Sequence, residues 1–139
     1  MIRATLAALA LLATPALADE TWTNPAGTLI YEVDMGHIAV LSFPIAATPL
    51  AQAGGQPRAA VYLPGLGGNF DNRSIHDGYW ATPGAPVCTA SLTTPDGITT
   101  QNWGRARIVF DRAAFPTGFT MLIGSCLDEP TLPIRADLP

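Results

Sequence analysis

Short stretches of the chain alternate between apolar and polar residues, and proline or glycine separates one stretch from the next. Residues 28–33 follow the two-residue period of a strand with one buried face. Residues 37–43 form a second apolar run, and the intervening Asp34-Met35-Gly36 has the composition of a turn. The pattern therefore predicts a β-hairpin over residues 28–43.

Five further runs rich in β-branched and aromatic residues follow, and each has the length of a strand. The run over residues 105–111 has the clearest alternation. The run over residues 119–126 is apolar at consecutive positions, as in a strand covered on both faces. Residues 64–78 are the longest interval without a strand pattern, and the tail after Asp128 is predicted to be extended. The five runs are residues 58–63, 79–82, 87–92, 105–111 and 119–126, with a Pro95-Asp96-Gly97 turn between the third and the fourth.

The spacing of apolar positions does not favour helices anywhere after the first eighteen residues. No window there repeats its apolar residues every three and four positions, and 13 glycines and 13 prolines are spread along the chain. At 139 residues the chain has the length of one domain. We expect an all-β fold, either a small antiparallel β-sandwich or a compact barrel of about seven to eight short strands.

The first eighteen residues have the features of a secretory signal peptide. Arg3 provides a positive charge, residues 4–13 form a short apolar run, and Ala16-Leu17-Ala18 matches the small-x-small pattern of a cleavage site. We therefore expect residues 1–18 to be a signal peptide and residues 19–139 to be a single domain, periplasmic or secreted. No later stretch is apolar for long enough to be a transmembrane segment, so none is expected in the mature chain.

Cys88 and Cys126 are the two cysteines of the chain. In an exported protein such a pair predicts a disulfide, and the absence of a C-x-x-C spacing favours a structural bond over a redox-active one. A disulfide that closes the loop from Cys88 to Cys126 contributes roughly 4 kcal/mol to the free energy of unfolding in the chain-entropy view.

The charge of the chain excludes some partners. Seven basic residues, all of them arginine, stand against eleven acidic ones, which gives a net charge of −4. Because there is no excess of positive charge, nucleic acid is not an expected partner. We expect no cofactor and no bound metal, since neither His37 nor His76 lies in a zinc-binding motif.

Two short segments are similar to motifs of known families. Trp22-Thr23-Asn24-Pro25-Ala26-Gly27 resembles the first-strand W-x-N-x-x-G of avidin-type barrels, which implies a barrel. The later aromatic and polar pattern of that family is missing, so biotin binding is not implied. Residues 61–69 resemble the strand and oxyanion loop of α/β-hydrolases. The chain has no G-x-S-x-G elbow and no helical periodicity, and that fold is therefore rejected.

Residues 65–80 concentrate glycines, hydrogen-bonding side chains and aromatic rings in one segment. Such composition suits a recognition loop, and it also suits a surface loop whose aromatic rings pack on the core. We predict a non-catalytic ligand- or protein-binding accessory module, with an unknown protein or glycan as its partner. Its candidate binding residues are Asn69, Asp71, Arg73, His76, Asp77, Tyr79 and Trp80, with Trp103 and Arg105 from a later strand.

Two alternatives remain open at this point. One is a small periplasmic hydrolase or metal-dependent enzyme centred on His76, with Asp71 or another acid as its partner. The other is a structural subunit of an envelope complex, marked by an exposed strand edge or apolar patch. We do not expect an enzyme, because no catalytic set of residues has suitable spacing.

Overall fold

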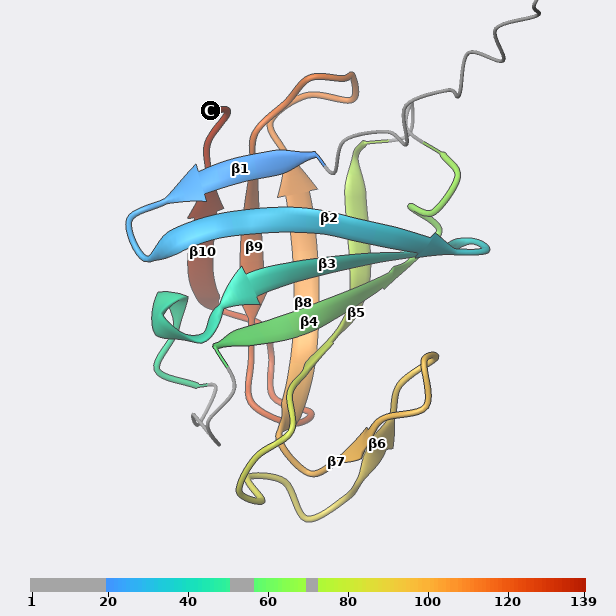
Figure 1. The fold of residues 1–139 in the computed structure, drawn as a ribbon, viewed down its shortest axis with the longest axis vertical. Helices are drawn as coiled ribbons and strands as arrows, with labels where there is room; N and C mark the ends of the chain where they lie inside the picture. The colour runs from blue at the N-terminus through green and yellow to red at the C-terminus, as the bar shows by residue number, and fades with distance from the viewer. Residues whose placement is uncertain (1–19, 51–56, 70–72) are drawn as a thin grey trace, which may run out of the picture.

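The computed structural model describes residues 20–50, 57–69 and 73–139. Eight antiparallel strands form one sheet in the order β1-β2-β3-β4-β5-β8-β9-β10 (Figure 1). The strands β6 and β7 form a separate small hairpin. The elements are β1 (Thr21–Asn24), β2 (Gly27–Met35), β3 (Ile38–Pro44), the short 3₁₀ helix η1 (Ile45–Ala47), β4 (Arg58–Pro64), β5 (Ile75–Ala81), β6 (Leu92–Thr93), β7 (Thr99–Thr100), β8 (Trp103–Phe110), β9 (Phe119–Ile123) and β10 (Leu132–Ala136).

The sheet nearly closes into a barrel where its first and last strands meet. Thr23 of β1 and Asp137, just after β10, form an antiparallel bridge with N–O distances of 2.8 and 3.0 Å. In Figure 1, β1 to β4 cross in front of β5, β8, β9 and β10 at a steep angle, as in an orthogonally packed barrel. The all-β prediction is therefore confirmed, and of the two architectures the structure matches the barrel, in a nearly closed form.

The core lies between these two crossing layers. Strand residues of one parity point inward and are buried, whereas their neighbours face outward, as the two-residue period requires. Aromatic rings fill much of the space: Trp22 and Phe119 meet edge to face at 4.8 Å, and Phe110 and Phe119 at 5.5 Å. The largest fully buried apolar side chains are Trp22, Leu29, Leu41, Phe43, Leu63, Leu66, Trp80, Ile108, Phe119, Met121 and Ile123.

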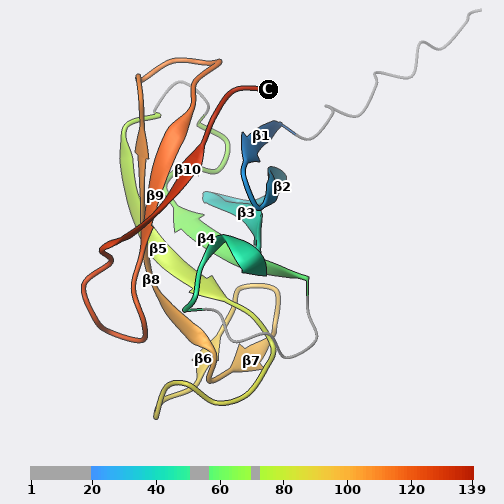
Figure 2. The ribbon, with the colours of Figure 1, turned by 90° about the vertical axis from the view of Figure 1, so that its left-hand side faces the viewer.

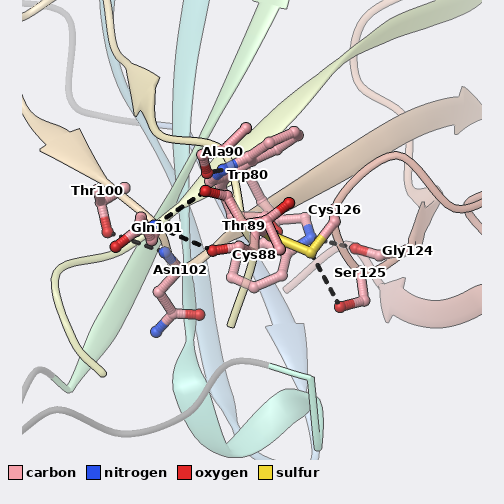
Figure 3. The surroundings of a disulfide bond; sticks show 11 residues. Trp80, Cys88, Thr89, Ala90, Thr100, Gln101, Asn102, Gly124, Ser125 and Cys126 are labelled. Carbon is pink, nitrogen blue, oxygen red and sulfur yellow. Dashed lines mark hydrogen bonds between the residues drawn. A yellow bond between two sulfur atoms is a disulfide. The ribbon is translucent and has the colours of Figure 1, made fainter. Parts of the chain in front are cut away.

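A second apolar cluster lies on the outside of the barrel. The segment between β5 and β8, which contains the β6–β7 hairpin, packs on outward-facing residues of β3, β4 and β8 such as Val40, Tyr62 and Trp103. Figure 2 shows the course of this hairpin below β4 and β5. The disulfide between Cys88 and Cys126 fixes this segment to the chain just after β9, with a Cα–Cα distance of 5.6 Å (Figure 3). The predicted disulfide is confirmed, and its place shows that it anchors the outer layer.

Three predicted elements differ from the structure. β5 begins at Ile75, four residues before the predicted strand. Its first half was not predicted because the inward residues there are His76 and Gly78, which do not give an apolar pattern. Of the predicted strand 87–92, the structure keeps only the end, as β6. The strand predicted for residues 119–126 ends at Ile123, as β9. The tail after Asp128 was predicted to be extended, and it contains the strand β10. The Pro95-Asp96-Gly97 turn is confirmed by the hydrogen bond from Gly97 N to Thr94 O.

The predicted signal peptide, residues 1–18, lies outside the described residues. Across the described ranges, no helix has the length and apolar character needed to span a membrane.

Candidate functional site

The nine candidate binding residues separate into three groups. Asp71 lies outside the described residues, and Asn69 is exposed in the turn region after β4. Because side chains alternate along β5, that strand places half of its candidates inside the barrel and half on its outer surface. The inward residues of β5 are His76 and Trp80, and Arg73, just before the strand, is buried as well. The outward residues are Asp77 and Tyr79 on β5 with Trp103 and Arg105 on β8.

The inward residues are buried and belong to the structure of the barrel. Arg73, just before β5, is 1% exposed and forms a bidentate ion pair with Glu20. His76 is 8% exposed, and its ring lies close to Gly65. Trp80 is fully buried and donates a hydrogen bond from Nε1 to the carbonyl oxygen of Gly124, at 2.7 Å. These three side chains have little or no surface to offer a partner.

The outward residues form a continuous surface on two paired strands. In the register of the sheet, Asp77 lies opposite Arg107 and Tyr79 lies opposite Arg105. Arg107 Nε donates to Asp77 Oδ1 at 2.6 Å, and Arg105 lies 3.7 Å from the carboxylate of Glu129. The hydrogen bond from Arg107 is the main cause that lowers the pKa of Asp77 below its ordinary value. Asp77 is therefore ionised at neutral pH, and the pair stays charged.

Tyr79 and Trp103 form the aromatic part of this surface. Their rings meet edge to face with centroids 6.1 Å apart. Tyr79 is 41% exposed. Trp103 is covered by the connection between β5 and β8 that contains the β6–β7 hairpin, and its Nε1 donates a hydrogen bond to Ala90 O at 2.8 Å. Trp103 thus supports Tyr79 from one side. We call Asp77, Tyr79, Arg105 and Arg107 the β5–β8 face; Arg107 was not among the predicted binding residues.

A hollow of about 230 Å³ lies beside this face, between the barrel wall and the β6–β7 hairpin. Its residues are Arg58, Ala60, Tyr62, Ala81, Thr82, Pro83, Thr94, Asp96 and Ile98. No sequence pattern marks this hollow, because its residues come from three separate segments and two of them are alanines. The Pro95-Asp96-Gly97 turn was the one signal at hand, and it was interpreted as a turn alone.

The described residues contain no group of three or more histidine, cysteine or acidic side chains that could hold a metal ion. His76 does not line the hollow. An enzyme centred on His76 and Asp71 stays a prediction, since Asp71 lies outside the described residues.

No family model, curated protein or solved structure matches this chain.

Proposed function

We propose that the protein is an exported, non-catalytic binding module that holds a protein partner on the β5–β8 face, in the periplasm or outside the cell. The observation that carries the proposal is the joint exposure of Tyr79, Arg105 and Arg107 on two rigid, hydrogen-bonded strands. Tyrosine and arginine are, together with tryptophan, the residue types that most often dominate the energy of a protein interface.

The packing of the barrel supports an external site over an internal one. In small barrels side chains fill the interior unless a ligand chamber is kept open. Here large buried side chains from both layers, Trp22, Phe43, Trp80 and Phe119 among them, occupy the interior of the described part. Any partner of that part therefore meets the outer surface or the ends of the barrel.

The charges of the face indicate what kind of surface it would meet. Two arginines are balanced by Asp77 and Glu129, so the face has no strong net charge. A partner with mixed polar and aromatic character fits this arrangement better than a strongly acidic one. Export is supported by the disulfide, because such bonds persist in oxidising compartments.

Site-specific photo-crosslinking in the native host tests the proposal. A photoreactive residue at Ile75, which is 58% exposed at the start of β5, samples the neighbourhood of the face without replacing any of its members. We expect a discrete crosslink to one other protein, and we expect its loss when Tyr79→Ser and Arg107→Ser are introduced together.

A photoreactive residue at Val33 on β2 is the matched control, since Val33 is similarly exposed and belongs to another part of the barrel. The absence of any crosslink from Ile75, or the same crosslinked proteins from Val33, would show that the β5–β8 face is not the contact surface.

A further inference from the structure

The hollow between the barrel wall and the β6–β7 hairpin is a separate feature from the β5–β8 face, with no residue in common. Its floor is made by Ala60 on β4 and Ala81 on β5, which lie directly opposite each other in the sheet. Both alanines face the outside of the barrel. Because their side chains are small, a space remains between them and the β6–β7 hairpin that covers them. The hollow thus follows from two alanines at one register position.

One rim of the hollow carries a negative charge. Asp96, at the tip of the hairpin, accepts hydrogen bonds from the Tyr62 hydroxyl at 3.0 Å and from the Thr94 hydroxyl. Both donors are neutral, and Asp96 takes part in no ion pair among the described residues. Burial and the nearby Asp96 carboxylate raise the pKa of Tyr62 to about 12, so this hydroxyl keeps its proton at physiological pH.

Another part of the lining carries a positive charge. Arg58 donates to Ser42 Oγ at 2.9 Å, to Ser42 O at 3.0 Å and to Thr28 O at 2.7 Å. Glu32 belongs to the same network, but it accepts its hydrogen bond from Ser42 rather than from the arginine. Within the described part of the chain, Arg58 therefore has neutral hydrogen-bond acceptors and no ion pair.

The hairpin that carries Asp96 is fixed before any ligand arrives. Thr94 and Ile98 exchange hydrogen bonds across the turn, and Thr100 Oγ1 donates to Thr82 O at 2.8 Å, which ties the hairpin to the chain after β5. The Cys88–Cys126 disulfide adds a covalent link. A site whose walls are already ordered avoids the entropy cost of ordering them on binding.

We propose that this hollow binds a small zwitterion of amino-acid size, with its ammonium group toward Asp96, its carboxylate toward Arg58 and its apolar part over Ala60 and Ala81. The volume agrees with this class of ligand. At about 230 Å³ it lies below the roughly 300–1,000 Å³ of pockets that hold drug-sized molecules.

Nuclear magnetic resonance titration of the oxidised mature protein tests the site with defined probes: glycine betaine, L-proline and L-valine. We expect at least one of them to shift the resonances of Ala60, Ala81 and Ile98 in a saturable way. For the probe that binds, forms with only one charge (choline for betaine, the methyl ester or the N-acetyl derivative for an amino acid) are expected to bind roughly tenfold more weakly or worse.

Two variants place the binding in the hollow. Ala60→Leu fills the floor from outside the core, so we expect a folded protein that has lost the titration. Asp96→Asn keeps a hydrogen-bond acceptor for Tyr62 and is expected to weaken binding roughly tenfold. The matched controls are Ala114→Leu, an exposed position in the β8–β9 loop, and Asp128→Asn in the β9–β10 loop; both should bind like the unaltered protein.

Circular dichroism and thermal unfolding confirm that each variant is folded, so a loss of binding can be assigned to the site. Three results would overturn the proposal: no saturable shift with any of the three zwitterions, equal binding of a singly charged form, or full binding by a folded Ala60→Leu protein. None of them bears on the crosslinking experiment, because the probes and the residues replaced are different.

Discussion

The guanidinium of Arg73 and the carboxylate of Glu20 form a bidentate ion pair at the end of the barrel where β5 begins, with N–O distances of 2.8 and 2.7 Å. Arg73 is almost fully buried, and its guanidinium lies 5.6 Å from the ring centre of Phe110 and 4.9 Å from that of Phe115. The pair joins the chain just before β1 to the chain just before β5, 53 positions apart. A charge buried among aromatic rings depends on its counter-ion, and the first prediction follows from this.

Glu20→Gln should lower the free energy of unfolding by about 3 kcal/mol, because it removes the carboxylate from a bidentate ion pair whose arginine is buried. Urea unfolding followed by tryptophan fluorescence measures the change. The comparison is Asp111→Asn, which removes the carboxylate from the exposed pair with Arg135 and should cost less than about 1 kcal/mol. Similar losses in the two variants would mean that burial of the Arg73 pair does not increase its contribution.

The strand pattern could be predicted from the sequence wherever the inward positions were apolar, as in β8, where Ala106, Ile108 and Phe110 alternate with outward residues. It failed in β5, whose inward residues include His76 and Gly78. Histidine faces inward there near the end of the barrel. Glycine is needed because a Cβ at position 78 would lie 1.9 Å from the carbonyl oxygen of Tyr62. Neither reason is visible in a periodicity of hydrophobic residues.

The residues of the candidate site could not be grouped correctly from the sequence either, because closeness along the chain does not show which side chains meet in the fold. His76, Tyr79 and Trp80 were grouped as one candidate site because they are close along the chain. The alternation of β5 places Tyr79 on the outside of the barrel wall and the other two inside. The hollow depends instead on Ala60 and Ala81, which meet only through strand pairing. The disulfide was predictable because two cysteines allow one intramolecular pairing.

Gly104 on β8 lies close to Gly124, just after β9, and to the ring of Trp80. A Cβ at position 104 would lie 1.9 Å from the carbonyl oxygen of Gly124 and 2.5 Å from Nε1 of Trp80, which bond to each other. Gly104→Ala should therefore destabilise the protein by about 3 kcal/mol, since neither backbone nor buried indole has room to move. Thermal unfolding and near-ultraviolet circular dichroism, to which the buried Trp80 contributes, report the effect.

Gly36→Asn is the companion variant for that measurement. Gly36 has a φ of +62° and no atom within 4 Å of an added Cβ, and asparagine tolerates this left-handed conformation better than most residues. Its stability should stay within about 1 kcal/mol of the unaltered protein. If Gly104→Ala were equally mild, the close approach of β8 to Gly124 would not be a constraint on the fold.

The disulfide gives the third prediction. Replacing Cys88 and Cys126 together by serine should lower the free energy of unfolding by about 4 kcal/mol, because the unfolded chain loses a cross-link across 38 positions. Denaturant unfolding of the oxidised protein and of the variant measures this difference, and reductant should destabilise only the oxidised protein. A variant as stable as the oxidised protein would contradict this account.

Hydrogen exchange should further show that, without the disulfide, protection of backbone amides falls first in the β6–β7 hairpin, whose outer position depends on this bond.

Tyr62 makes the stability depend on alkaline pH. Burial, together with Asp96, raises its pKa from 10.0 to about 12, so the folded protein holds the phenolic proton more tightly than the unfolded chain does. The stabilisation is fully present below the unfolded pKa and is lost as the pH rises through the folded one, at up to about 1.4 kcal/mol per pH unit. The pKa of Tyr31 is also raised, chiefly by burial, and contributes with the same sign.

Tyr62→Phe should therefore reduce the decline of the free energy of unfolding with rising pH without abolishing it. Urea unfolding of both proteins between pH ~9 and pH ~11 measures the two slopes, and equal slopes would show that Tyr62 ionises alike in the folded and unfolded chains.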